Sequence, residues 1–351
     1  MKRLLSNLAI IVVAIGLAEG AIRVIVPEWN AFSSERFMQG AELPGFQPYL
    51  TGMKDFRGKF AQNNGDFQIN IAINATGQRE EDTPAEANGR IWGVGDSYSF
   101  GWGVDKEQTY LAVLGRLMGK PSYNLAGPGN DVCGYQAAVM AMPEPRTPAG
   151  FVLGLTIEND VDKNHCQPGS YVAPATAEES TAPTPTARQR FVHVKDWLIQ
   201  SSALYNFTVV TLKRSKRLND LLISLGLVER PHQVGDHYPE SEIDDRIAST
   251  VAKIAWLRER FTPETPFVVL LIPALLDIRD QDPFFARIRQ GLTAELKRRS
   301  VSVVDPYEDF IRAGFKPTHF VHDGHWSPRG HEVAAEALAR WFQGISRSSL
   351  P

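Results

Sequence analysis

The chain has 351 residues, of which 43% are hydrophobic and 22% charged, and its formal net charge at pH 7 is −3. This composition is typical of a globular protein long enough for one large α/β domain with additions. The slightly acidic balance argues against general nucleic-acid binding, so we expect no nucleic-acid partner.

The N-terminus has the pattern of an export signal. Lys2 and Arg3 precede an apolar stretch from Leu8 to Ala18, which is shorter than the roughly 20 residues of a full membrane span. Ala18-Glu19-Gly20 is a weak cleavage site. Glu19 and Arg23 are four residues apart, and apolar residues continue to Val26, so the segment can continue as a helix.

We therefore predict that residues 1–26 are an uncleaved signal anchor at the inner membrane, with a cleaved signal peptide as the alternative. Positive charge on the cytoplasmic side places the rest of the chain in the periplasm, or makes it secreted if the signal is cleaved. A buried N-terminal helix of a cytoplasmic protein is a third interpretation.

Residues 27–64 are rich in Pro, Gly, Phe and Asn without a helical period, and we predict an extended linker there. The main domain is expected at 65–346. It begins with an alternating strand at 67–73 and a turn at 74–79. The apolar run 91–94 then predicts a strand that enters a tight turn at Gly95-Asp96-Ser97.

Strands and helices alternate over the rest of the chain. Helices are predicted at 110–118, 133–142, 247–261 and 284–299, with one or two more in 190–227, and strands at 151–157, 267–272 and 301–304. Ser327 and Pro328 are typical of a helix start. The segment 167–188, rich in Pro, Ala, Ser and Thr, predicts a mobile surface insertion. The alternation predicts an α/β fold, a doubly wound parallel sheet with helices on both faces.

Three residues have the chemistry of nucleophilic catalysis. Ser97 lies in a turn of the kind that presents a nucleophile, and its hydroxyl needs a neutral imidazole and an orienting carboxylate. We predict that His325 is the base and that Asp323 orients it, which requires an irregular loop that Gly324 permits. The alternatives are a turn serine that caps a helix and an ordinary surface or core histidine.

Four further residues are candidates near this site. The side-chain amide of Asn159 is the type of donor that an oxyanion hole needs, although a turn residue is the alternative. Asp96 is expected to accept backbone hydrogen bonds and stiffen the turn, and Asp160 is expected to be structural. Arg79 is a candidate for binding a substrate anion or bracing the site, with a plain surface charge as the alternative.

Two other patterns bear on metal binding and redox chemistry. Four residues lie close together near the C-terminus: His322, Asp323, His325 and His331. No carboxylate- or Cys-rich cluster accompanies them, so we expect no metal and no cofactor. Cys133 and Cys166 form one disulfide in an oxidising compartment or remain two free thiols, and the sequence leaves both open.

Four sequence blocks resemble those of the SGNH (GDSL-type) hydrolase superfamily. They are Gly95-Asp96-Ser97-Tyr98, Tyr123 to Asn130, Glu158-Asn159-Asp160 and Asp323-Gly324-His325. The resemblance covers residues 65 to 343 and implies an SGNH-hydrolase-like, flavodoxin-like three-layer sandwich. It also implies an oxyanion hole formed by the backbone N–H groups of Ser97 and Gly129 together with the Asn159 amide.

The spacing of Asp323 and His325 is Asp-x-His, where most of the superfamily has Asp-x-x-His. This form is similar to the branch containing periplasmic polysaccharide O-acetyltransferases such as those acting on alginate. The resemblance implies a serine esterase or O-acyltransferase with an acyl-serine intermediate, acting on a small ester or on an acetylated or short-acyl carbohydrate of the envelope. A non-catalytic protein that binds polysaccharide or assembles with a membrane complex is the first alternative, and a lipase is the second.

Overall fold

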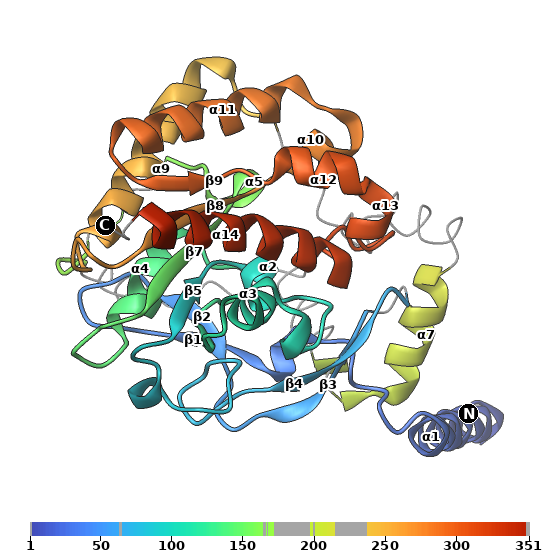
Figure 1. Cartoon of the computed structure of the whole chain (residues 1–351). Helices are drawn as coiled ribbons and strands as arrows, with labels where there is room; N and C mark the ends of the chain where they lie inside the picture. Colours follow the sequence, from blue (N-terminus) through green and yellow to red (C-terminus); the bar gives the residue numbers. More distant parts are fainter. Residues whose placement is uncertain are drawn as a thin grey trace.

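The body of the protein is an α/β domain around one parallel sheet. The computed structural model describes residues 2–62, 65–163, 166, 168–171, 197–198, 201–214 and 237–348. Its five-stranded sheet has the order β6-β5-β7-β8-β9 (Figure 1). The strands are β5 (Ile91–Val94), β6 (Ser122–Asn124), β7 (Gly150–Thr156), β8 (Phe267–Ile272) and β9 (Ser302–Val304), and each neighbouring pair is parallel.

Helices cover both faces of this sheet, as the sequence predicted. Side chains alternate along a strand, so Phe151 and Leu153 of β7 face one core and Val152 faces the other. The first core is closed by α4 (Val132–Met140), α9 (Ile243–Arg258) and α11 (Pro283–Arg298), and the second by α3 (Tyr110–Met118), α12 (Tyr307–Ala313) and α14 (Pro328–Ser348). The doubly wound three-layer fold is confirmed.

The carboxyl ends of the parallel strands carry short helices. They are α2 (Ser97–Phe100) after β5, α5 (Ile157–Asp160) after β7, and α10 (Leu275–Asp280) after β8. The chain leaves β5 for β6 on one side and returns to β7 on the other, so the strand order reverses between β5 and β7. Crevices at such reversals are the usual binding places of open α/β sheets.

Residues 27–64, where we expected an extended linker, contain three strands: β1 (Met38–Ala41), β2 (Tyr49–Gly52) and β3 (Arg57–Ala61). β1 pairs with β2, and β3 pairs with β4 (Gln68–Ala72), both antiparallel. Phe60 of β3 and two isoleucines of β4 form a separate small core with the neighbouring Phe37 and Phe67 and with Phe100. The strands are only four or five residues long, each contains a Gly, and prolines lie between β1 and β2, so their sequence shows no clear period.

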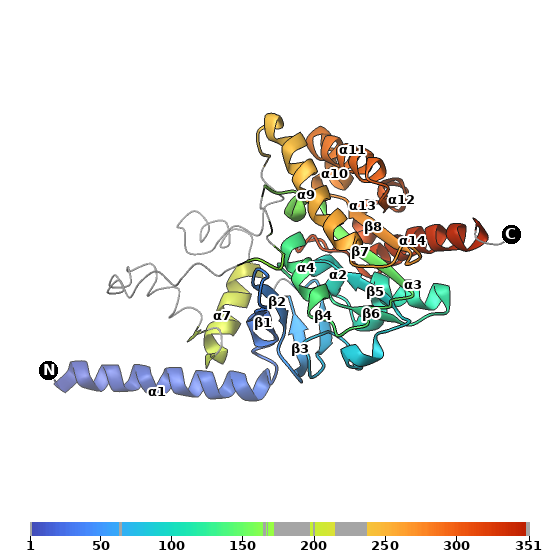
Figure 2. The ribbon, with the colours of Figure 1, turned by 90° about the vertical axis from the view of Figure 1, so that its left-hand side faces the viewer.

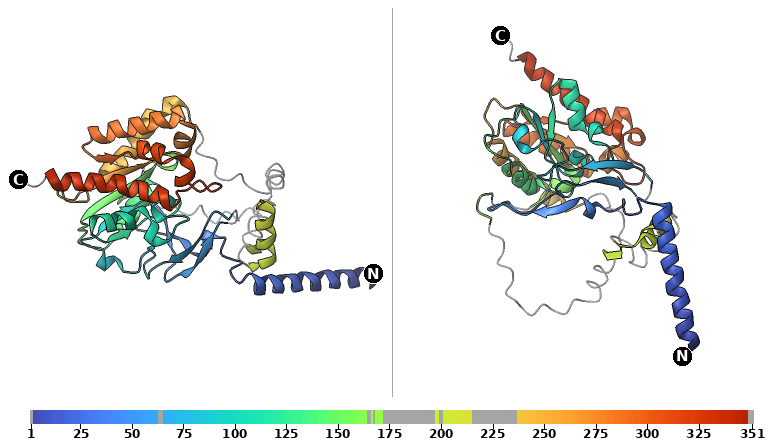
Figure 3. Two further views of the ribbon diagram at one scale, coloured as in Figure 1. Left: turned by 45° about the vertical axis from the view of Figure 1, so that its right-hand side comes forward. Right: turned by 90° about the horizontal axis from the view of Figure 1, so that it is seen from below.

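Helix α1 (Lys2–Ile25) extends away from the body (Figure 2). Several of its apolar side chains are exposed, among them Ile10, Val12 and Leu17. Near its end, the Glu19 carboxylate accepts hydrogen bonds from Ser202 and from the first backbone N–H groups of α7 (Ala203–Arg214), which lies beside it (Figure 3). None of the helices in the described residues is both long and apolar enough to span a membrane.

The remaining described helices are α13 (Phe315–Thr318) and the one-turn helices at Ser34–Arg36, Pro84–Glu86, Lys106–Gln108 and Glu240–Glu242. Of the predicted insertion at 167–188, only residues 168–171 are described, and most of 190–227 also lies outside the described residues.

Candidate active site

The tight turn after β5 presents Ser97 at the first position of α2. A side chain at Gly95 would collide with Ser99 and with the backbone oxygen of Gly154, so only glycine fits there. Asp96 caps α2 by accepting a hydrogen bond of 3.0 Å from the Tyr98 backbone N–H. Asp96 is 1% exposed, and burial raises its pKa despite its hydrogen bonds. The turn is therefore fixed in the interior of the domain.

The imidazole of His325 connects Ser97 to Asp323. The distance from Ser97 Oγ to His325 Nε2 is 2.8 Å, and that from His325 Nδ1 to Asp323 Oδ1 is 2.5 Å. Gly324 between them has a φ of +87°, a conformation that suits glycine and folds the Asp323 carboxylate back onto the ring. The structure thus joins three side chains from opposite ends of the domain in one hydrogen-bonded chain.

The electrostatics of this pair suit a base. Burial opposes the charge on His325, but the Asp323 carboxylate outweighs burial and raises the pKa of His325 above its usual value. Burial acts on Asp323 as well, yet the imidazole and hydrogen bonds from His325 and Gln62 lower the pKa of Asp323. Asp323 is therefore kept in its ionised form, which favours a positive charge on the adjacent His325 ring.

The predicted oxyanion-hole donors lie on segments that hydrogen bonds connect to the turn carrying Ser97. Among the described residues, neither the Ser97 nor the Gly129 backbone N–H donates a hydrogen bond. Gly129 has a φ of +85°. Its loop is tied to the nucleophile turn by a 3.0 Å bond from the Gly127 N–H to the Gly95 carbonyl. Asn159 Nδ2 donates to Asp96 Oδ2 at 3.1 Å, which places this exposed amide beside the residue that precedes Ser97.

The two neighbours of Asn159 differ in role. Asp160 is fully buried and accepts hydrogen bonds from the Tyr135 hydroxyl and the Thr156 N–H, as expected of a structural residue. Glu158 is half-buried, and its carboxylate accepts a 2.8 Å hydrogen bond from the Leu275 N–H at the start of α10. Burial raises the pKa of Glu158 to about 6. No local sequence pattern indicates this contact between Glu158 and Leu275.

Arg79 is a buried brace rather than a surface charge. Its side chain is 2% exposed, and its guanidinium donates to the carbonyls of Asn70, Phe100, Gly101 and Val104. Burial lowers its pKa to about 10. The structure therefore places Arg79 between β4 and the loop after α2, with its donors directed at backbone oxygens rather than at a substrate anion.

Three contacts to the His325 loop were missed by sequence reasoning. Gln62 donates to Asp323 Oδ2 at 2.5 Å, and the rings of Tyr98 and Trp102 lie 4.8 and 5.7 Å from the His325 ring. Gln62 is 261 residues from Asp323 in sequence, so no local pattern signals that pair. Tyr98 follows Ser97 directly in the sequence, and that adjacency was the one available signal.

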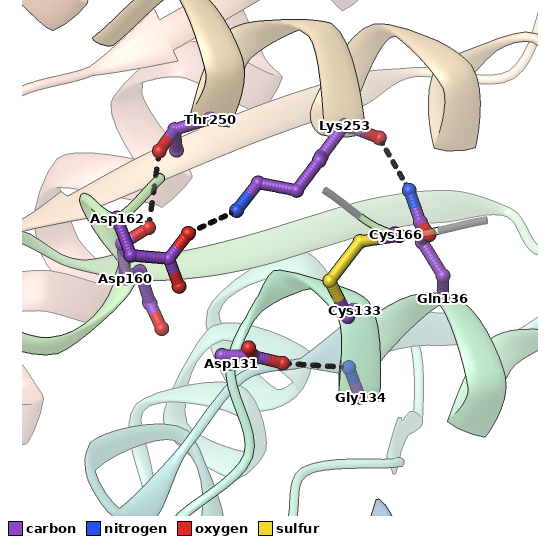
Figure 4. The surroundings of a disulfide bond; sticks show 9 residues. All are labelled: Asp131, Cys133, Gly134, Gln136, Asp160, Asp162, Cys166, Thr250 and Lys253. Carbon is purple, nitrogen blue, oxygen red and sulfur yellow. Dashed lines mark hydrogen bonds and ion pairs between the residues drawn. A yellow bond between two sulfur atoms is a disulfide. The ribbon is translucent and has the colours of Figure 1, made fainter. Parts of the chain in front are cut away.

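Cys133 and Cys166 form a disulfide with an S–S distance of 2.03 Å. Figure 4 shows it joining α4, which follows the Gly129 loop, to the chain beyond α5. Lys253 of α9 reaches the same segment through an ion pair of 2.5 Å with Asp162. These contacts link the two segments that carry Gly129 and Asn159. No group of three or more His, Cys, Asp or Glu that fits a metal ion occurs within the described residues.

No family model matches the sequence, and no curated protein does. Similar solved structures include a member of the lipolytic protein G-D-S-L family from Veillonella parvula, with 13% identity and a TM-score of 0.39, covering 72% of this chain and 98% of that one. A lipolytic protein of the same family from Desulfitobacterium hafniense has 12% identity and a TM-score of 0.39, with 72% and 99% covered.

A carbohydrate esterase family 2 enzyme from Corynascus thermopiles, which carries a carbohydrate-binding domain, has 15% identity and a TM-score of 0.42. The match covers 76% of this chain and 68% of that chain. All three likenesses are distant and carry no conclusion about the chemistry of this chain.

Proposed function

We propose that this protein is an SGNH-type serine esterase or O-acyltransferase that works through an acyl-serine intermediate. The single observation that carries the proposal is the hydrogen-bonded chain from Ser97 Oγ through the His325 imidazole to Asp323, with distances of 2.8 and 2.5 Å. This order of hydroxyl, imidazole and carboxylate is what an activated serine nucleophile needs.

In the first half-reaction, Ser97 Oγ attacks the ester carbonyl carbon while His325 Nε2 takes the hydroxyl proton. The carbonyl oxygen becomes an oxyanion, for which the backbone N–H groups of Ser97 and Gly129 and the second N–H of the Asn159 amide are the donors. When the tetrahedral intermediate collapses, His325 gives its proton to the leaving alcohol. The products are the free alcohol and acyl-Ser97.

In the second half-reaction, water or a carbohydrate hydroxyl gives its proton to His325 and attacks the acyl carbon. Collapse returns the proton to Ser97 Oγ and releases either a carboxylic acid or a new ester. The two fates differ only in the acceptor, so the same three side chains serve an esterase and a transferase.

We further propose that the substrate is an acetyl or short-acyl ester of an envelope or exported carbohydrate, and that the protein contacts the inner membrane through α1 with its catalytic domain in the periplasm. The Asp-x-His spacing supports the carbohydrate substrate through its family resemblance. The exposed apolar side chains of α1 support membrane contact. The disulfide supports an oxidising compartment.

The decisive experiment treats the purified protein with a fluorophosphonate probe and with nitrophenyl esters of acetate and of a long-chain acid. We expect labelling at Ser97 and faster turnover of the acetate. An unlabelled wild-type protein without turnover of either ester would favour the non-catalytic alternative, and a strong preference for the long acyl chain would favour a lipase. Addition of acetylated and free oligosaccharides then separates hydrolysis from transfer by mass spectrometry.

A further inference from the structure

The Asp323 carboxylate is held on both of its oxygens. Oδ1 accepts hydrogen bonds from the side chain and the backbone N–H of His325, at 2.5 and 3.2 Å. Oδ2 accepts a hydrogen bond of 2.5 Å from Gln62 Nε2. The side chain of Asp323 is 6% exposed, so Gln62 occupies a place that water cannot readily take. The amide thereby sets the rotation of the carboxylate relative to the imidazole.

A second residue of the same hairpin turn holds the backbone of the loop. Asp66 Oδ2 accepts from the N–H groups of His322 and Asp323, at 2.9 and 2.8 Å. Its Oδ1 lies 2.7 Å from Nδ1 of His322. These contacts fix the two residues immediately before Gly324, where the chain turns back to place His325 over Asp323.

The β3–β4 hairpin packs against both the segment that carries Ser97 and the loop that carries His325. Its turn is closed by hydrogen bonds from Gly65 to Gln62 and from Gln62 to Phe67. Phe60 packs edge-on against Trp102 with ring centroids 4.6 Å apart, and Phe67 lies 5.3 Å from Phe320. Trp102 follows the nucleophile helix and Phe320 begins the His325 loop, so the hairpin contacts both sides of the site.

From this arrangement we infer that Gln62 and Asp66 are positioning residues for catalysis, Gln62 orienting the Asp323 carboxylate and Asp66 the loop that carries it. The inference rests on the proposed function. In this role the β3–β4 hairpin, which lies outside the parallel sheet, completes the active site. Hydrogen bonds to the far oxygen of a carboxylate fix its direction where its own irregular loop does not.

Within the described residues, several titratable groups interact with His325, and Gln62 donates a hydrogen bond to one of them, Asp323. These groups are Asp96, Glu158, Asp323, Tyr98 and the buried imidazoles of His319 and His331. Replacing Gln62 leaves all of them except Asp323 in their places. A change in the titration of His325 in such a variant therefore reports the Asp323 contact.

The test replaces Gln62 with Met, which keeps the length of the side chain and removes the amide. The matched control is Gln68→Met, because Gln68 lies on the paired strand, is exposed and donates to Glu28. We expect Gln62→Met to lower kcat for nitrophenyl acetate about tenfold with little change in KM, the size expected for one hydrogen bond to a charged group. The acidic limb of kcat/KM should move to lower pH, because a less well oriented Asp323 supports the imidazolium less.

Gln68→Met should match the wild type in both measurements. In an Asp323→Ala background, Gln62→Met should slow the enzyme no further, since Gln62 acts through Asp323. Equal rates and pH profiles for Gln62→Met and the wild type overturn the inference, as does an undiminished effect in the Asp323→Ala background. Gln62→Asn, whose amide is one methylene short, provides a second variant if Gln62→Met does not fold, and it should show the same shift.

An NMR titration of histidine-labelled protein carrying Ser97→Ala measures the pKa of His325 without any turnover. A lower pKa in the Gln62→Met variant supports the inference, and an unchanged pKa contradicts it. An inactive wild-type protein with an intact shift in this titration contradicts the proposed function alone. An active wild-type protein without the shift contradicts the positioning role alone.

Discussion

The two sides of the candidate active site are built differently. Ser97 lies on a turn that is packed into the core. Asp96 beside it is 1% exposed, and Gly95 has no room for a side chain. His325 sits on an irregular surface loop, its side chain 23% exposed, and polar contacts from a separate hairpin hold that loop. A turn packed into the core cannot shift without disturbing the core, whereas a loop held by hydrogen bonds can be adjusted by single residues.

The largest expected effect is on the nucleophile side. Ser97→Ala should lower turnover by several orders of magnitude and abolish fluorophosphonate labelling, because covalent catalysis needs that oxygen. Ser99→Ala is the matched control in the same helix. Its hydroxyl is buried and paired with Tyr110 at 2.8 Å, so this variant should lose stability and keep its turnover. Equal turnover in Ser97→Ala and the wild type would disprove the assignment of the nucleophile.

The second prediction distinguishes a catalytic role of Asn159 from a structural one. Asn159→Ala should cost about 3 kcal/mol of transition-state stabilisation, or about a hundredfold in rate, by removing an oxyanion donor. It should cost only about 1 kcal/mol of folding stability through the lost bond to Asp96. Tyr135→Phe should lower folding stability and leave the rate nearly unchanged, because the Tyr135 hydroxyl donates hydrogen bonds to the buried Asp160. Melting temperatures and rates measured on both variants test this contrast, and a structural Asn159 would show the pattern of Tyr135.

The third prediction concerns the disulfide on the nucleophile side. Cys133 and Cys166 are 33 residues apart, and closing a loop of this size stabilises a fold by about 4 kcal/mol. The double variant Cys133→Ser/Cys166→Ser should therefore melt at a lower temperature, and a reductant should destabilise the wild type but not the variant. If the reductant leaves the melting of the wild type unchanged, the bond contributes little. Turnover well below the melting range should change less than in Asn159→Ala.

The smallest expected effect is the pH dependence of the folding stability that His325 and Asp323 contribute. The raised pKa of His325 contributes stability that is present below the ordinary histidine value of 6.5 and is lost as pH rises through the raised value. The lowered pKa of Asp323 contributes stability that is present above the ordinary value of 3.8 and is lost as pH falls through the lowered value. The pair therefore stabilises the fold most between these two ordinary values.

Activity should follow the opposite course, since the base must be neutral to accept the serine proton. Rates should rise with pH through the raised pKa of His325 while the stability contributed by the pair falls. Urea unfolding and kcat/KM measured on the wild type and on Asp323→Ala between about pH 5 and 9 test this. Parallel changes of rate and stability with pH in the wild type would contradict the assignment.

The central domain was predictable because local patterns and tertiary structure agree there. The helix at 110–118 and the strands at 91–94 and 267–272 were predicted with the bounds that α3, β5 and β8 have. Buried parallel strands are continuous apolar runs, and helices on the sheet need one apolar face, so each element carries its own signal. The turn at Ser97 and the left-handed Gly324 follow from the same local reasoning.

Other features were decided only by the tertiary structure. The pairing of Cys133 with Cys166, the burial of Arg79 among backbone carbonyls and the hydrogen bond from Gln62 to Asp323 each depend on segments brought together by folding. Strand β3 within 27–64 belongs to the same class, because Phe60 packs against Phe37, Phe67 and Trp102 rather than following a strand pattern of its own. The sequence by itself determined the sheet and the residue types of the site, since apolar runs and glycine turns are recognisable from neighbouring residues alone. The contacts that hold the His325 loop join residues more than two hundred positions apart, so only the folded chain decides them.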